Sequence, residues 1–105
     1  MALPQEWSST TTLTLVATIT ARSGQADIVE AGLRQLVSAS RAEAGCLQYD
    51  LHRHQDDTDV FVMIEQWQDS AALTFHQNTD HYRHFKATCG GALQDVVLQP
   101  LNRIA

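Results

Sequence analysis

Apolar residues in this chain alternate with polar ones over several stretches, and residues 60–67 are apolar on both faces of a predicted strand. Successive side chains of a strand point to opposite sides of its sheet. One face would carry Val60, Val62 and Ile64. The other face would carry Phe61, Met63 and Trp67. Such a strand needs a cover on each side, and the helices that flank it in sequence can supply only one.

The preceding residues predict a strand and a helix. Period-two alternation of β-branched and polar residues indicates a strand over residues 12–20. A helix follows, because one stripe at helical spacing carries Val29, Leu33, Leu36, Val37 and Ser40. We expect Ser23 to cap its start and Gly45 to end it in the left-handed conformation.

A hairpin is predicted next, with its turn in residues 55–58. If the turn centres on Asp57, three residues of the first strand, Leu47, Tyr49 and Leu51, lie opposite Trp67, Glu65 and Met63. A register shifted by one residue would instead place Tyr49 on the face of Ile64. The sequence leaves both registers open.

The remaining pattern predicts two short helices and a last strand. Asp69 or Ser70 would cap the first helix, over residues 71–77, and Thr79 or Asp80 would open the second, which Gly90 and Gly91 close. Residues 94–101 form the last strand, with Pro100 at an edge or near its end. The order is strand, helix, strand, strand, helix, strand, as in the ferredoxin-like α+β fold with a four-stranded antiparallel sheet.

This fold covers one sheet face with helices and leaves the other bare. Because Val60, Val62 and Ile64 would lie on the bare face, we predict a homodimer in which two sheets pack face to face. Residues 12–105 would form one domain, and the polar residues 1–11, including Trp7, a loose lead-in.

Composition narrows the partners. The chain has 105 residues and a net charge of −5, and its seven Lys and Arg are scattered, which argues against nucleic acid or an anionic membrane as a partner. It contains no apolar run long enough to span a bilayer and no secretory signal pattern. Two cysteines without a paired motif suit a reduced, cytoplasmic protein.

Candidate chemistry gathers where sheet and helices would meet. Glu65 interrupts an apolar run, and a buried carboxylate must be paired, hydrogen-bonded or neutralised. It could be a site carboxylate with a raised pKa, could orient a histidine, or could be a structural partner of Arg53 or a histidine. His76 and His81 lie on the segments expected to cover a pocket, where either could be a general base or a structural residue.

Other motifs are weak. His52 and His54 share a strand face, but no third and fourth ligand stands at matched spacing, so no metal site is predicted and both are expected to be surface residues near a turn. Gly90 and Gly91 end a helix, so they do not form a phosphate-binding loop. No Ser or Cys nucleophile motif is present.

Four segments in order, residues 15–19, 41–52, 61–67 and 76–85, resemble the antibiotic biosynthesis monooxygenase domain, and the likeness runs from about Thr12 to Leu101. The resemblance implies a dimeric α+β barrel with a pocket between each sheet and its helices. Characterised relatives include cofactor-independent quinol or anthrone monooxygenases, haem-degrading oxygenases and enzymes acting on a phosphorylated signal, so the family does not fix the reaction.

The resemblance implies an oxygenase that needs no cofactor or metal. A base, His76 or His81, would deprotonate a quinol or polycyclic phenol that then reacts with O2, and Glu65 would orient that base. The substrate contacts would come from Trp67, Tyr49, Tyr82, Phe85 and Met63. Haem degradation is disfavoured, because the matching family branch uses an Asn in the first strand and none occurs here. The alternatives are a non-catalytic binding or stress-related module and an isomerase or lyase of a small carbonyl metabolite.

Overall fold

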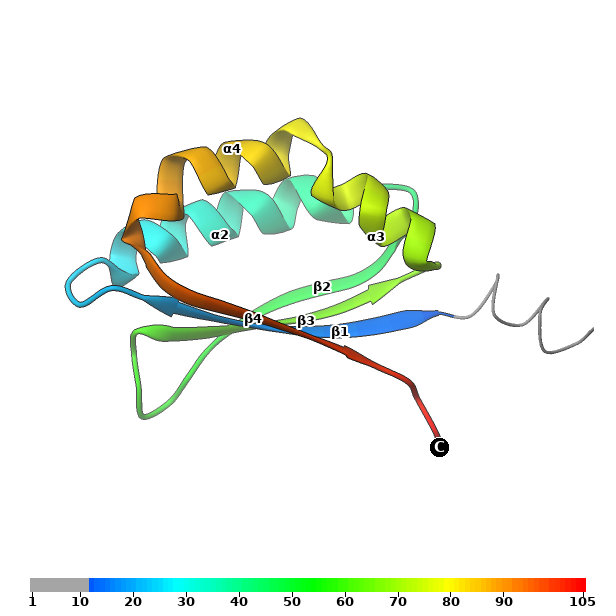
Figure 1. Cartoon of the computed structure of the whole chain (residues 1–105), viewed down its shortest axis with the longest axis horizontal. Helices are drawn as coiled ribbons and strands as arrows, with labels where there is room; N and C mark the ends of the chain where they lie inside the picture. The colour runs from blue at the N-terminus through cyan, green and yellow to red at the C-terminus, as the bar shows by residue number, and fades with distance from the viewer. Residues whose placement is uncertain (1–11) are drawn as a thin grey trace, which may run out of the picture.

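The computed structural model describes residues 12–105 (Figure 1). In chain order its elements are β1 (Leu13–Ala21), α2 (Ala26–Arg41), β2 (Cys46–Arg53), β3 (Val60–Trp67), α3 (Ser70–Gln77), α4 (Asp80–Cys89), the short 3-10 helix η1 (Gly90–Ala92) and β4 (Leu93–Leu101). The predicted lead-in and Trp7 lie outside the described residues.

The strands form one antiparallel sheet in the order β2-β3-β1-β4. Of the elements in residues 12–105, all helices lie on one side of this sheet and none lies on the other (Figure 1). The ferredoxin-like α+β prediction is therefore confirmed. Pro100 lies near the end of the edge strand β4, where its missing N–H breaks no central ladder.

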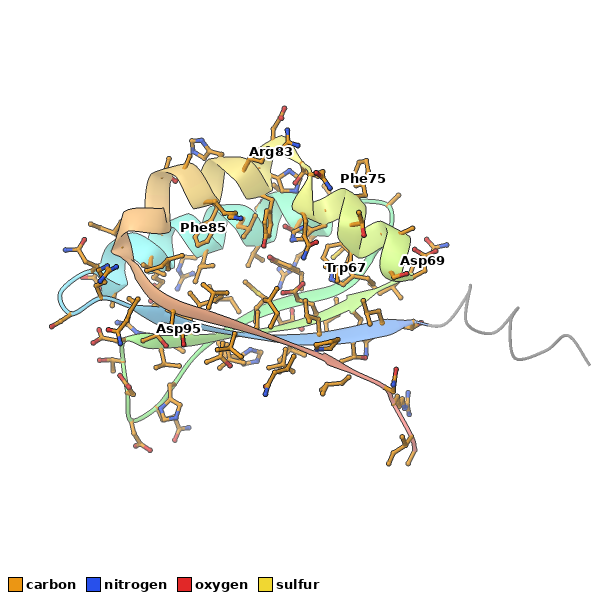
Figure 2. All side chains as sticks on the ribbon, viewed as in Figure 1. Trp67, Asp69, Phe75, Arg83, Phe85 and Asp95 are labelled. Carbon is orange, nitrogen blue, oxygen red and sulfur yellow. The ribbon has the colours of Figure 1, made fainter. Side chains whose placement is uncertain are left out.

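The inward face of β3 is the centre of the core. Phe61, Met63 and Trp67 are buried, as the alternation predicts, and they pack in one cluster with the α2 stripe. Figure 2 shows Trp67 and Phe85 between helices and sheet, whereas Phe75 of α3 points away from it. Each fully buried large apolar side chain contributes roughly 1.5–3 kcal/mol to folding.

The hairpin register is the first of the two predicted, except at its open end. Tyr49 pairs with Glu65, and Leu51 pairs with Met63. The predicted pairing of Leu47 with Trp67 is wrong, because the register shifts between Cys46 and Gln48 and Cys46 stands opposite Trp67. A bulge inserts one unpaired residue in a strand, and Leu47 is 56% exposed as a result.

Two helix-end predictions are also wrong. Ser23 does not cap α2: the capping position is Gln25, without a side-chain hydrogen bond, and Gly24 turns the chain at φ +81°. Gly45 does not end the helix in the left-handed conformation either, because the C-cap is Ala42 in a right-handed one. Gly45 instead packs against α3, where a Cβ would lie 2.5 Å from the Ala72 Cβ.

The caps of the later helices follow the sequence. The Asp69 side chain accepts a hydrogen bond from the Ala72 N–H at the start of α3. The Thr79 side chain accepts one from the Tyr82 N–H at the start of α4. These two bonds satisfy helix N–H groups that have no partner within the helix.

On the bare sheet face Val60, Val62 and Ile64 are half-buried in the single chain. The homodimer stays a prediction. Of the helices in residues 12–105, none has the length and apolar character needed to cross a membrane.

Candidate active site

A cavity of about 270 Å³ lies between the sheet and helices α2 and α4. Its wall is mostly apolar and includes Leu33, Leu36, Met63, Phe85, Val96 and Leu98. The residues with polar side chains in its wall are Tyr49, Glu65, Tyr82 and Lys86. A few polar groups in an apolar cavity are typical of a small-molecule site. Two larger depressions are more open to solvent.

Glu65 is the carboxylate of this cavity. It points inward from β3 and is 4% exposed, and the Trp67 Nε1–H donates a hydrogen bond to its Oε1 at 2.9 Å. Burial raises the pKa of Glu65 to about 7, the nearby charge of Glu43 adds to the rise, and the indole bond opposes it. A carboxyl group with this pKa can accept and release a proton near neutral pH.

Two tyrosine hydroxyls accompany this carboxylate. Tyr49 comes from β2 and Tyr82 from α4, and burial raises the pKa of both, with the charge of Glu65 adding to the effect. Both hydroxyls therefore stay protonated at neutral pH and can donate hydrogen bonds to a substrate oxygen.

His76 lies behind the cavity wall. Its side chain is buried, its Nε2 lies 3.4 Å from the Tyr49 hydroxyl, and its ring packs 4.5 Å from the Trp67 ring and 4.9 Å from the Tyr82 ring between centroids. Burial lowers the pKa of His76, although Glu43 opposes this. His76 therefore contacts two residues of the cavity wall, Tyr49 and Tyr82, without lining the cavity itself.

Glu43 joins the two predicted histidines. His76 Nδ1 lies 2.8 Å and His81 Nε2 2.7 Å from the same carboxylate oxygen, Glu43 Oε2. We expected Glu65 to orient a histidine, but Glu65 bonds Trp67 and the orienting carboxylate is Glu43. Glu43 stands in the loop after α2, 33 residues before His76, so no local spacing links them.

The other histidines are surface residues. His52 and His54 are exposed, and His54 Nδ1 accepts hydrogen bonds from the Asp56 and Asp57 N–H groups in the hairpin turn. Arg53, the other suggested partner of Glu65, pairs with Glu30 instead. Of the residues predicted to contact substrate, the cavity wall includes Tyr49, Met63, Tyr82 and Phe85, while Trp67 lies behind Glu65.

Comparison with known proteins gives a consistent result. The family model described as "Antibiotic biosynthesis monooxygenase" matches residues 12–88. "Putative monooxygenase YcnE" of Bacillus subtilis is 46% identical over 54 residues, a match that spans 51% of this chain and 57% of YcnE. "Putative monooxygenase Rv0793" of Mycobacterium tuberculosis is 29% identical over 89% of this chain and 95% of its own length.

A solved structure extends the likeness to the whole fold. PA3566 from Pseudomonas aeruginosa is 54% identical, covers 93% of this chain and 98% of its own, and superposes with a TM-score of 0.87. The likeness thus includes β4, which follows the residues matched by the family model.

Proposed function

Because this chain belongs to the antibiotic biosynthesis monooxygenase family, we propose that it oxidises a small quinol with O2 and without a cofactor. The observation that carries the proposal is Glu65. Among the described residues that line the cavity it is the one carboxylate, and its pKa of about 7 suits a general base.

In the first step Glu65 accepts the phenolic proton of the quinol. Its Oε1 is engaged by the Trp67 indole, so Oε2 is the oxygen that receives the proton. Tyr49 and Tyr82 donate hydrogen bonds to the substrate oxygens and stabilise the anion that forms. General-base catalysis of this kind contributes roughly 10² to 10⁴ in rate.

The quinol anion then transfers an electron to O2, and the two radicals combine to form a C–O bond on the ring. The peroxide takes back the proton held by Glu65. Loss of the ring C–H proton at the oxygenated carbon then cleaves the O–O bond, and the departing hydroxide leaves with a proton as water, so one oxygen atom stays on the ring as a hydroxyquinone. The quinol supplies all the electrons. The apolar wall keeps water from the radical pair.

His76 and His81 are less suited to be the base than we expected from the sequence, since neither lines the cavity. We propose that His76 is a positioning residue that acts through Tyr49. Its ring packs behind the wall, and its Nε2 faces the Tyr49 hydroxyl.

Cavity size favours a small substrate. A volume of about 270 Å³ lies just below the usual range of ligand pockets, roughly 300–1,000 Å³. A quinol of one or two fused rings suits this space better than a larger polycyclic anthrone.

The test uses 1,4-naphthohydroquinone, prepared without air and mixed with protein, ¹⁸O2 and a metal chelator. We expect 2-hydroxy-1,4-naphthoquinone with one ¹⁸O atom, formed faster than with heat-inactivated protein. Formation of only the unhydroxylated quinone and H2O2, at the rate without protein, would overturn the proposal. Tight binding of the quinol without turnover would instead indicate the non-catalytic binding module.

A further inference from the structure

Three side chains of metal-ligating type converge outside the cavity. Glu43, His76 and His81 each offer one ligand atom, and these atoms lie within 4.8 Å of one another. The carboxylate comes from the loop after α2, and the two histidines come from α3 and α4, on either side of the Thr79 cap. The cap bonds and the Thr79 Oγ1 bond to the His76 carbonyl hold this junction in place.

The spacing of these atoms is close to that of a coordination shell. Two ligands about 2.1 Å from one ion lie roughly 3.0 Å apart at an octahedral angle and 3.4 Å apart at a tetrahedral angle. The two nitrogens lie 2.8 Å and 2.7 Å from Glu43 Oε2. Each nitrogen–oxygen pair would have to open by about 0.2–0.3 Å to reach the octahedral spacing and by about 0.6–0.7 Å to reach the tetrahedral one.

Glu43 has unused coordinating capacity in a buried setting. Its side chain is 6% exposed, and its second oxygen, Oε1, is buried without a hydrogen-bond partner. An unsatisfied buried acceptor costs roughly 1–3 kcal/mol. Within residues 12–105, no Lys or Arg forms an ion pair with Glu43, and its partners are the two histidines.

An ion could reach this cluster from solvent. Glu43 and His81 line an open groove between the loop after α2 and the α3–α4 junction, together with Gly45, Asp69 and Phe75. His81 is 28% exposed on its side chain, whereas His76 is almost fully buried. The cluster therefore has one accessible ligand and two ligands fixed in the interior.

We propose that Glu43, His76 and His81 form a binding site for a divalent transition-metal ion of the zinc type. Two imidazole nitrogens and one carboxylate suit zinc, cobalt or ferrous iron, whereas magnesium requires oxygen ligands. The second nitrogen of His76 faces the Tyr49 hydroxyl, a contact that would fix the ring for coordination through Nδ1. The bound ion would tie the loop after α2 to the α3–α4 junction.

The test measures metal binding directly on the full chain, freed of any polyhistidine tag and of bound metal. Calorimetry should show one Zn²⁺ per chain, Co²⁺ should give ligand-field absorption at the same stoichiometry, and Mg²⁺ should not bind. His81→Ala and Glu43→Gln should each weaken Zn²⁺ binding by at least about tenfold. The matched control is His84→Ala, because His84 is an exposed histidine on the same helix.

Absence of Zn²⁺ and Co²⁺ binding in the wild type would overturn the proposal, as would equal affinity in His81→Ala and His84→Ala. His81→Ala keeps the test usable if Glu43→Gln fails to fold, since His81 is the accessible ligand. No substrate is needed, so this result stands apart from the proposed quinol oxidation, which is assayed with a chelator.

Discussion

At the scale of single residues, the carboxyl group of Glu65 is the proposed proton acceptor and can be tested by an isosteric change. Glu65→Gln keeps an oxygen that accepts the Trp67 indole bond but removes the basic group. We expect quinol oxidation to fall roughly 10² to 10⁴-fold. In the wild type the rate should rise with pH through about 7, as Glu65 ionises, and the variant should lose this rise.

Glu30→Gln is the matched control, because Glu30 pairs with Arg34 and Arg53 and does not line the cavity. Its steady-state rate and pH profile should follow the wild type. If both variants react like the wild type, Glu65 is not the base.

The same carboxyl group makes a prediction about stability. The pKa of Glu65 rises from 4.5 to about 7 on folding, so the native state holds a proton more tightly than the unfolded chain. The contribution of Glu65 to the free energy of unfolding is therefore fully present below pH 4.5. It falls by about 3 kcal/mol as the pH rises to 7. The difference in unfolding free energy between wild type and Glu65→Gln, measured by urea denaturation, should follow this decline and level off above pH 8. A difference in unfolding free energy that is constant from pH 4.5 to 8 would show that folding does not raise the pKa of Glu65.

Glu65 could be predicted from the sequence and Glu43 could not, because the burial of the two carboxylates has different causes. Glu65 interrupts a run of apolar residues in a strand, so its burial follows from local alternation. Glu43 follows the end of α2 and becomes buried only when α3 and α4 pack over it, through contacts to His76 and His81. No residue pattern within a single helix or strand predicts a contact between residues so far apart in the sequence.

At the scale of elements, α2 and α4 pack closely at a glycine. A Cβ at Gly32 would lie 2.4 Å from the Cys89 sulfur and 3.3 Å from two atoms of the Phe85 ring. Gly32→Ala should therefore destabilise the fold by about 1–3 kcal/mol, despite the higher helix propensity of Ala. Chemical denaturation measures this directly.

Gly91→Ala serves as the control, since a Cβ there meets nothing within 4 Å. It should change stability by less than about 0.5 kcal/mol. Replacing Cys89 with Ala in the Gly32→Ala background removes the colliding sulfur and should recover part of the loss. Equal stabilities for Gly32→Ala and Gly91→Ala would show that α2 and α4 can move apart at Gly32 without a measurable loss of stability.

The elements themselves were largely predictable because alternation and capping are local signals. Nearby residues limited each of the caps at Asp69 and Thr79 to two candidates, and the pairing of Tyr49 with Glu65 was one of two registers that the sequence left open. The bulge at Leu47 and the close approach of Gly45 to Ala72 could not be predicted from nearby residues, since each depends on an element that lies elsewhere in the sequence.

At the scale of the whole molecule, the bare sheet face is apolar at the middle of β3 and polar at the β2 edge. One row across the strands reads His52, Val62, Thr18 and Val97, and the next reads Asp50, Ile64, Val16 and Gln99. Val97 is 43% exposed in the single chain. Apolar side chains on a sheet face that no helix of residues 12–105 covers are typical of a protein interface, which supports the predicted homodimer through this face.

A charge at the centre of that face should separate the two copies. Val62→Asp would bury a carboxylate between the sheets, where no Lys or Arg of the paired rows can neutralise it, so the dimer should dissociate while the far-UV circular dichroism stays native. Sedimentation at micromolar concentration should give twice the 11.7 kDa chain mass for the wild type and the single mass for the variant. Ile28→Asp is the control, because Ile28 is 53% exposed on a helix away from the sheet, and this variant should remain dimeric. If the wild type sediments with the mass of a single chain, the apolar face of β3 is exposed to water and the dimer prediction is wrong.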